Sequence, residues 1–314
     1  MKKIVISAIA LLSVPALYAQ PQLTADNIDE VISAMTLEEK ATLCVGGARA
    51  SIVEGVTSGL IKEVPGAAGN TRPIPRLGIP NTVLADGPAG LRISPTREGT
   101  TQTFYCTGFP VGTLLASSWD TALVERVTSA MGNEVLEYGV DVLLAPGVNI
   151  HRNPLCGRNF EYFSEDPVLS GNMGAAYIKG IQSNGVGTSI KHYAVNNQET
   201  NRNEDNAVVG VRALREIYLK NFEIAITKGA PWTVMSSYNK LNGDYAQQSE
   251  DLLTKVLRDD WGYKGIVMTD WGSKTATAKS AASGNDLMEP GNQTEIDRIV
   301  AAVKDGSLPE ELLD

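Results

Sequence analysis

The chain has 314 residues, of which 43% are hydrophobic and 20% charged, a balance typical of a globular protein with a sizeable core. Its 27 Lys and Arg residues against 36 Asp and Glu give a formal net charge of -9, which argues against a nucleic-acid partner because phosphate binding depends on clustered basic side chains. The two histidines and three widely spaced cysteines show no metal-ligand spacing. Three cysteines cannot form a paired disulfide framework, so we expect buried thiols, with one bridge as the alternative.

The first residues have the pattern of a secretory signal peptide. Lys2 and Lys3 precede an apolar stretch that ends near Leu17, and the small residue Ala19 follows. We expect residues 1–19 to be removed on export to the periplasm or the outside of the cell. The alternative is a membrane anchor, which is disfavoured because so short an apolar run barely spans a bilayer. The sequence thus predicts a mature chain with no membrane attachment.

Short apolar runs recur along the rest of the chain and predict buried strands. They lie at 82–85, 140–145, 186–190, 232–235 and 265–269. Continuous apolar runs of this length suit strands that are buried on both faces, as in a parallel sheet. Polar residues stand at or just beyond the ends of these runs, and they include Asp86, Lys191, His192, Tyr238 and Asp270.

Helical signals lie before and between these runs. Thr36 and Glu39 have the spacing of a capping box, in which each side chain bonds to the other's backbone amide. Apolar residues keep a helical period over 123–136. Three further helical stretches are each followed by a glycine suited to a left-handed C-terminal cap, at Gly185, Gly229 and Gly306.

Alternating strands and helices over this length predict an α/β fold, a (β/α)₈ barrel of the TIM type that ends within its last helix. The alternative is a doubly wound open sheet, but no glycine-rich phosphate-binding motif follows the first strand. Such barrels carry their active sites at the C-terminal ends of the strands. We therefore expect the polar residues at the strand ends to converge on one pocket.

Asp270 and Trp271 follow the last apolar run. A carboxylate beside an aromatic ring suits attack on the anomeric carbon of a sugar, because the charge stabilises an oxocarbenium-like transition state and the ring stacks on sugar C–H groups. The alternative for Asp270 is a helix N-cap, a position that aspartate favours.

Lys191, His192, Arg158 and Asp86 supply hydrogen-bonding groups for sugar hydroxyls. Each has a structural alternative. Lys191 would lie on the surface, His192 would be a satisfied core residue, Arg158 would pair with a nearby acid, and Asp86 would brace the turn after it. Spacing alone leaves these alternatives open.

Five segments together resemble the barrel domain of glycoside hydrolase family 3. They are LADGPAG at 84–90, GRNFE at 157–161, KHYAVNNQE at 191–199, MSSYN at 235–239 and VMTDW at 267–271. The resemblance runs from about residue 26 to the end of the chain, and the motifs occur in the family's order. It implies a retaining, exo-acting β-glucosidase that removes terminal non-reducing β-D-glucosyl residues from small or oligomeric β-glucosides, with no metal or organic cofactor.

The resemblance also implies a role for each matched residue. Asp270 matches the catalytic nucleophile, which forms a covalent glycosyl-enzyme intermediate. The residues that match the surroundings of the bound sugar are Asp86, Arg158, Lys191, His192 and Tyr238, with Trp271 beside the nucleophile and Met235 in the pocket wall. A β-xylosidase is the alternative within the family, and the sequence makes no prediction about oligomeric state.

One part of the family pattern is missing. A retaining glycosidase needs a second carboxyl group as acid and base, about 5 Å from the nucleophile. In two-domain relatives this group comes from a following α/β sandwich domain, and we expect 20–314 to be the barrel domain without it. The single-domain branch uses a histidine on a barrel loop, but the other histidine here, His151, lies upstream. Glu199 and Glu204 have no family precedent as the acid, so a catalytically incomplete sugar-binding fragment is a further alternative.

Overall fold

A curled, six-stranded sheet forms the centre of the computed structural model, which describes residues 20–47, 64–272 and 274–314. The predicted signal peptide at 1–19 lies outside the described residues. In spatial order the strands are β1 (Gly69–Asn70), β2 (Val83–Asp86), β3 (Val142–Leu144), β4 (Gly187–Tyr193), β6 (Thr233–Ser236) and β9 (Ile266–Thr269). All five apolar runs thus form strands, as predicted. The strands from β2 to β9 are parallel, whereas β1 is antiparallel to β2.

The predicted eight-stranded barrel is confirmed only as an α/β fold with a curled sheet. Beyond β9, isolated bridges join Met268 to Leu287 and Met288 to Val45. The N–H of Gly47 then donates to the carbonyl oxygen of Asn70 in β1 at 2.7 Å. These short stretches link the two edges of the sheet without becoming regular strands, because glycine and proline interrupt them at 46–47 and 290–291 and both residues weaken strands.

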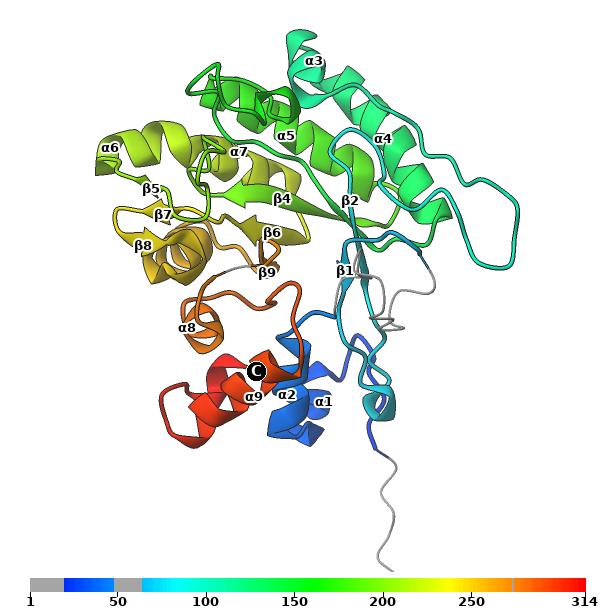
Figure 1. Ribbon diagram of the computed structural model, residues 1–314, viewed down its shortest axis with the longest axis vertical. Coiled ribbons are helices and arrows are strands. Elements are labelled where there is room, and N and C mark those ends of the chain that lie inside the picture. Colours follow the sequence, from blue (N-terminus) through cyan, green and yellow to red (C-terminus); the bar gives the residue numbers. More distant parts are fainter. Residues whose placement is uncertain (1–19, 48–63, 273) are drawn as a thin grey trace, which may run out of the picture.

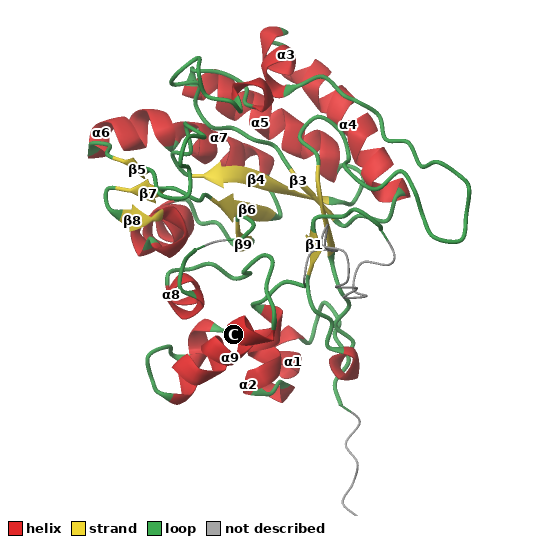
Figure 2. Cartoon of the chain, in the orientation of Figure 1, coloured by secondary structure: helices red, strands yellow, loops and turns green. Residues whose placement is uncertain are grey.

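Three helices cover the outer face of the parallel strands (Figures 1 and 2). They are α4 (Thr121–Glu137), α5 (Pro167–Gln182) and α7 (Lys220–Gly229), and α5 packs between the other two. The helical period predicted for 123–136 is confirmed, but the buried face of α4 is centred on Val124, Met131 and Val135, and Leu136 is largely exposed. This face, the buried sides of α5 and α7 and the strands form the main core.

The first and last described segments lie side by side at the other end of the molecule (Figure 1). The helices there are α1 (Ile28–Ala34), α2 (Leu37–Leu43), α8 (Thr277–Ala282) and α9 (Gln293–Lys304). α2 packs on α9 through a small core that includes Ala41, Val45, Ile296 and Ile299. The capping box predicted at Thr36 is confirmed at the start of α2.

One of the three predicted glycine caps is wrong. Gly185 and Gly306 follow α5 and α9 with left-handed φ values of 81° and 80°. Gly229, however, is the last residue of α7, and Ala230 takes the left-handed position with φ 50°. The reason for the glycine is close packing, since a Cβ at Gly229 would lie 3.1 Å from the side chain of Ile178 in α5.

Most of the remaining elements are short, but the π-helix η5 (Asp251–Asp260) has ten residues and packs Leu252, Leu253, Val256 and Leu257 into the main core. The others are α3 (Gly112–Ser117), α6 (Val211–Ala213), the π-helix η3 (Leu214–Tyr218), the 3₁₀ turns η1 (Pro75–Leu77), η2 (Asn159–Glu161), η4 (Ala246–Gln248) and η6 (Glu310–Leu312), and a three-stranded sheet of β5 (Asn206–Ala207), β7 (Lys240–Leu241) and β8 (Asp244–Tyr245). In the described part of the chain, no helix combines the length and apolarity that a membrane crossing requires.

Candidate active site

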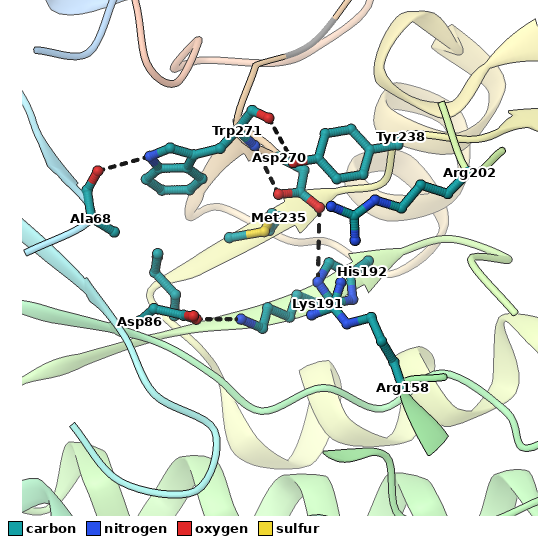
Figure 3. Close-up of a pocket in the computed structure, with 11 residues that line it drawn as sticks. Ala68, Asp86, Arg158, Lys191, His192, Arg202, Met235, Tyr238, Asp270 and Trp271 are labelled. Carbon is teal, nitrogen blue, oxygen red and sulfur yellow. Dashed lines mark hydrogen bonds and ion pairs between the residues drawn. The ribbon is translucent and has the colours of Figure 1, made fainter. Parts of the chain in front are cut away.

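A polar cavity of about 230 Å³ opens where the parallel strands end (Figure 3). Its lining contains all the residues predicted for the site, namely Asp86, Arg158, Lys191, His192, Met235, Tyr238, Asp270 and Trp271, together with Ala68, Leu144 and Arg202. The fold thus brings together residues that lie far apart in the sequence. Their chemical roles remain predictions from the sequence.

Asp270 follows β9 and is held by the backbone around it. Its N–H donates to the carbonyl oxygen of Ser236 at the end of β6, and its Oδ1 accepts from the N–H of Trp271 at 2.7 Å. The helix N-cap alternative is wrong, because α8 begins only at Thr277. Oδ2 is buried and has no hydrogen-bond partner among the described residues. The carboxylate therefore keeps one oxygen for another partner.

Burial of Asp270 leaves its carboxylate poorly solvated. Burial raises the pKa of its carboxyl, and the N–H of Trp271 and the charges of Lys191 and Arg158 act in the opposite direction. The side chain of Tyr238 also acts to lower this pKa. The imidazole of His192 faces Oδ2, with Nε2 at 3.8 Å. A poorly solvated carboxylate oxygen of this kind is suited to nucleophilic attack.

Lys191 lies inside β4 and is only 3% exposed, so the surface alternative for it is wrong. Its Nζ donates to Asp86 Oδ1 at 2.8 Å, across 105 positions of sequence. Burial tends to raise the pKa of Asp86, but Lys191 above all, with Arg158 and Arg92, leaves it lower than usual. Its lowered pKa favours the charged form of Asp86, which is a hydrogen-bond acceptor at the cavity wall.

His192 is buried and uncharged. Burial, reinforced by the positive charges of Arg158, Lys191 and Arg202, holds the pKa of its imidazole well below the usual value. The side chain of Asn149 fixes its backbone from both sides, accepting from His192 N at 2.7 Å and donating to His192 O at 2.9 Å. His192 is therefore a buried core residue, as the structural alternative predicted. It also faces the cavity.

Each of the two arginines in the lining is paired with a glutamate. Arg158 pairs with Glu161, as its structural alternative predicted, and still reaches the cavity. Arg202 pairs with Glu199 at 2.8 Å and lies 4.7 Å from the centre of the Tyr238 ring. Arg202 was not among the predicted site residues. The signal that could have found it is the dense run of polar residues after Lys191 and His192.

The aromatic wall of the cavity is rigidly held. Trp271 Nε1 donates to the carbonyl oxygen of Ala68 at 2.9 Å, and the Tyr238 hydroxyl donates to the carbonyl oxygen of Trp271 at 2.6 Å. Figure 3 shows both rings flanking the carboxylate of Asp270. Beside these rings, Met235 and Leu144 give the pocket an apolar part. Donors, one free carboxylate oxygen and a ring face thus surround one small space.

Comparison with known proteins identifies the family of the chain. The model of the glycosyl hydrolase family 3 N-terminal domain matches residues 84–314. The chain belongs to this family. It is 45% identical over 294 residues to thermostable beta-glucosidase B of Acetivibrio thermocellus, a match that covers 92% of this chain and 36% of the relative. It is equally 45% identical over 284 residues to an exo-alpha-(1->6)-L-arabinopyranosidase of Bifidobacterium longum, covering 89% and 35%.

Solved structures of family 3 enzymes share the fold. Beta-glucosidase 3B of Thermotoga neapolitana, solved in complex with glucose, superposes with a TM-score of 0.86 at 55% identity, covering 91% of this chain and 40% of that one. A beta-glucosidase of Bifidobacterium adolescentis gives 0.76 at 42% identity, covering 90% and 38%. The chain thus spans about a third to two fifths of the length of the relatives that it matches.

Within the described ranges of this family 3 chain, no group of three or more His, Cys, Asp or Glu side chains is placed to hold a metal ion. The three cysteines, all of which are described, are free, and Cys44 and Cys156 are buried. Burial raises the pKa of the Cys44 thiol to about 12. The prediction of buried thiols, rather than one bridge, is confirmed for these two.

Glu289 packs behind the loop that contains Asp270 and supports it through the backbone. Its N–H donates to Thr269 Oγ1 at 2.8 Å, and its carbonyl oxygen accepts from the N–H of Gly272 at 3.1 Å. The side chain lies against Gly46 and Gly69, where a Cβ would come within 2.2 and 2.8 Å of its atoms. Neither carboxyl oxygen has a hydrogen-bond partner among the described residues. Burial therefore raises the pKa of Glu289 well above 4.5, offset only in part by Arg72.

Replacing Glu289 by glutamine is expected to raise the free energy of unfolding at pH 7 by about 1–3 kcal/mol. A carboxyl group with a raised pKa in the folded state contributes its full stability below its unfolded pKa, near 4.5, and loses it as the pH rises through the folded pKa. Glutamine does not titrate and suffers no such loss. Urea unfolding at pH 5 and pH 8 measures the difference in the free energy of unfolding between the variant and the parent. This difference should be larger at pH 8.

The matched control for this substitution is Glu30→Gln, since Glu30 is exposed on α1. It should change the free energy of unfolding by less than about 0.5 kcal/mol at either pH. A Glu289→Gln variant that is less stable than the parent at pH 8 would show that the carboxylate is ionised and paired in the folded protein.

Proposed function

We propose that the chain forms the glucosyl-binding barrel domain, at 20–314, of a retaining, exo-acting β-glucosidase that hydrolyses terminal non-reducing β-D-glucosyl residues. The observation that carries this proposal is Asp270 Oδ2, a buried carboxylate oxygen without a hydrogen-bond partner in the described residues, inside a cavity otherwise rich in donors. The names of relatives such as the Acetivibrio and Thermotoga beta-glucosidases support the same reaction class.

In the proposed mechanism, Asp270 Oδ2 attacks the anomeric carbon as the bond to the leaving oxygen breaks, and a covalent glycosyl ester forms with inverted configuration. Water then attacks the same carbon and gives a proton to the acid/base group that had protonated the leaving oxygen, which restores the original configuration and frees Asp270. The N–H of Trp271 holds Oδ1 at 2.7 Å, so that Oδ2 is the attacking atom. Lys191, Arg158 and the charged Asp86 bind sugar hydroxyls, and the Trp271 ring stacks on the sugar face.

The size of the cavity favours removal of one sugar at a time. Its volume of about 230 Å³ is below the roughly 300–1,000 Å³ typical of pockets for drug-sized ligands. Such a space suits a single sugar ring, with the rest of the substrate outside. This supports exo action on the non-reducing end.

The acid/base group is proposed to come from outside this cavity's described lining, in the second domain that the resemblance predicts. Asp86 is the other carboxyl group in the lining, and its lowered pKa makes it a poor proton donor. Glu199 pairs with Arg202, while Glu204 is exposed and pairs with Lys274, and neither lines the cavity. The proposed domain arrangement thus leaves protonation of the leaving group to a residue beyond these.

Cleavage of a pentopyranoside is the second candidate activity, as a β-xylosidase or an arabinopyranosidase. The observation that favours it is the Bifidobacterium arabinopyranosidase, which is as similar to this chain as the Acetivibrio beta-glucosidase. Xylose lacks the C6 hydroxymethyl group of glucose, and L-arabinopyranose lacks it and also has the opposite configuration at C4. Paired kinetics on aryl β-glucosides, β-xylosides and α-L-arabinopyranosides therefore decide between the activities. A higher kcat/KM on either pentoside would overturn the glucosidase proposal.

Covalent trapping with 2,4-dinitrophenyl 2-deoxy-2-fluoro-β-D-glucoside tests the proposal on this chain itself. The leaving group is acidic enough to depart without a proton donor, so a missing acid does not prevent the first step. We expect a mass increase of one fluoroglucosyl group, located by peptide mapping on the peptide that contains Asp270. Labelling of another carboxylate, or none at all with intact protein, would reject Asp270 as the nucleophile.

Export is proposed on the basis of the signal pattern at 1–19, with the mature protein in the periplasm or outside the cell. N-terminal sequencing of the protein from its native host tests this directly. A sequence that begins at or near Gln20 would support the proposal, and one that retains Met1 would contradict it.

A further inference from the structure

Tyr162 is a fully buried residue that touches the site without lining the cavity. It directly follows η2, and its hydroxyl oxygen lies 3.2 Å from Nδ1 of His192. The two rings meet edge to face, with their centres 6.1 Å apart. The other ring nitrogen of His192, Nε2, points to Asp270 Oδ2 at 3.8 Å (Figure 3). The imidazole thus stands between a phenol and a carboxylate.

A neutral imidazole has one N–H donor and one acceptor nitrogen, and its neighbours decide which is which. The charges of three nearby basic residues and burial keep His192 neutral, as described above. Burial also raises the pKa of Tyr162 far above its usual value, so the phenol retains its proton. This proton needs an acceptor, and a buried hydroxyl left without one is costly.

In the described part of the chain, His192 Nδ1 is the hydrogen-bond partner recorded for the Tyr162 hydroxyl. If the hydroxyl donates to Nδ1, the imidazole proton is on Nε2 and faces the carboxylate. In the opposite tautomer, Nδ1 would donate to the phenol oxygen, the phenol proton would lose its acceptor, and the Nε2 lone pair would face the negative charge of Asp270. Both changes are unfavourable, so the two contacts select the same tautomer.

We propose that Tyr162 is a positioning residue that fixes His192 as the Nε2–H tautomer, so that His192 presents a hydrogen-bond donor to the cavity and to Oδ2 of Asp270. His192 then acts as a neutral donor and takes no part as a base. The inference is independent of the proposed function, because the tautomer exists in the free protein and is read without substrate.

Nitrogen-15 NMR of the chain labelled at histidine measures the tautomer directly. The chain has two histidines, His151 and His192, so two imidazole spin systems are expected. A His151→Gln variant assigns the remaining one to His192. We expect its proton on Nε2, with Nδ1 showing the shift of an unprotonated ring nitrogen. A proton on Nδ1, or on both nitrogens near pH 7, would overturn the proposal even if no further variant were made.

A Tyr162→Phe variant tests whether Tyr162 is the cause. Loss of one neutral hydrogen bond is expected to lower the ratio of Nε2–H to Nδ1–H forms by about fivefold. The matched control is Tyr177→Phe, another fully buried tyrosine, whose hydroxyl bonds to the carbonyl oxygen of Pro88 and to Met131. The control should leave the His192 tautomer unchanged. An unchanged tautomer in Tyr162→Phe would show that Asp270 alone selects it and would reject Tyr162 as the positioning residue.

Discussion

Replacing Asp270 by asparagine is expected to lower kcat/KM for aryl β-glucosides by roughly 10⁴-fold or more in the protein that contains this chain. The amide oxygen of asparagine still accepts from the N–H of Trp271, so the loop geometry is kept. What is lost is the negative oxygen that forms the glycosyl ester. Steady-state kinetics with nitrophenyl β-glucosides measure the effect.

The control for this variant is Asp259→Asn, which changes an exposed aspartate on η5 and should leave kinetics unchanged. Added azide sharpens the test, because a small anion replaces the missing nucleophile in a retaining glycosidase and yields the α-glycosyl azide when the acid remains functional. Turnover by Asp270→Asn within about tenfold of the parent would assign the nucleophile to another residue.

Replacing Asp86 by alanine is expected to destabilise the fold by about 2–4 kcal/mol and to weaken glucose binding strongly. The reason is an asymmetry in the pair with Lys191. The Lys191 side chain is 4% exposed and that of Asp86 is 37% exposed. Removing Asp86 leaves a buried ammonium group without its partner, whereas removing Lys191 leaves a carboxylate that can reach solvent and Arg92, whose guanidinium is 3.7 Å away.

The comparison variant is therefore Lys191→Met, which should cost less folding free energy than Asp86→Ala. Chemical unfolding and glucose titration calorimetry on the two variants measure both effects. The contribution of Asp86 to the stability of the fold also depends on pH. Since the pKa of Asp86 is lowered in the folded state, its contribution is present above its unfolded pKa, ordinarily 3.8, and is lost as the pH falls through the folded pKa. A Lys191→Met variant less stable than Asp86→Ala at pH 7 would contradict this account.

The five parallel strands were predictable because their signal is local. Runs such as Val83–Asp86 and Ile266–Thr269 are apolar, short and bounded by polar residues, and burial on both faces requires this pattern. The stretches at 44–47 and 286–288, which link the two edges of the sheet, were not predictable. Their pairing depends on single bridges between distant segments that glycines flank. The cap predicted at Gly229 is wrong for a similar reason. The glycine is required by close packing against α5 and not by the end of its own helix.

The identity of the family and its nucleophile candidate, Asp270, followed from the sequence alone, because motif residues and their spacing are properties of the chain. The tertiary structure alone decided the state of the site. It paired Lys191 with Asp86, brought Arg202 to the cavity, kept His192 neutral between Tyr162 and Asp270, and buried Glu289 behind the loop that contains Asp270. These properties depend on burial and on charges that meet through space, and neither is encoded in the local pattern of residues.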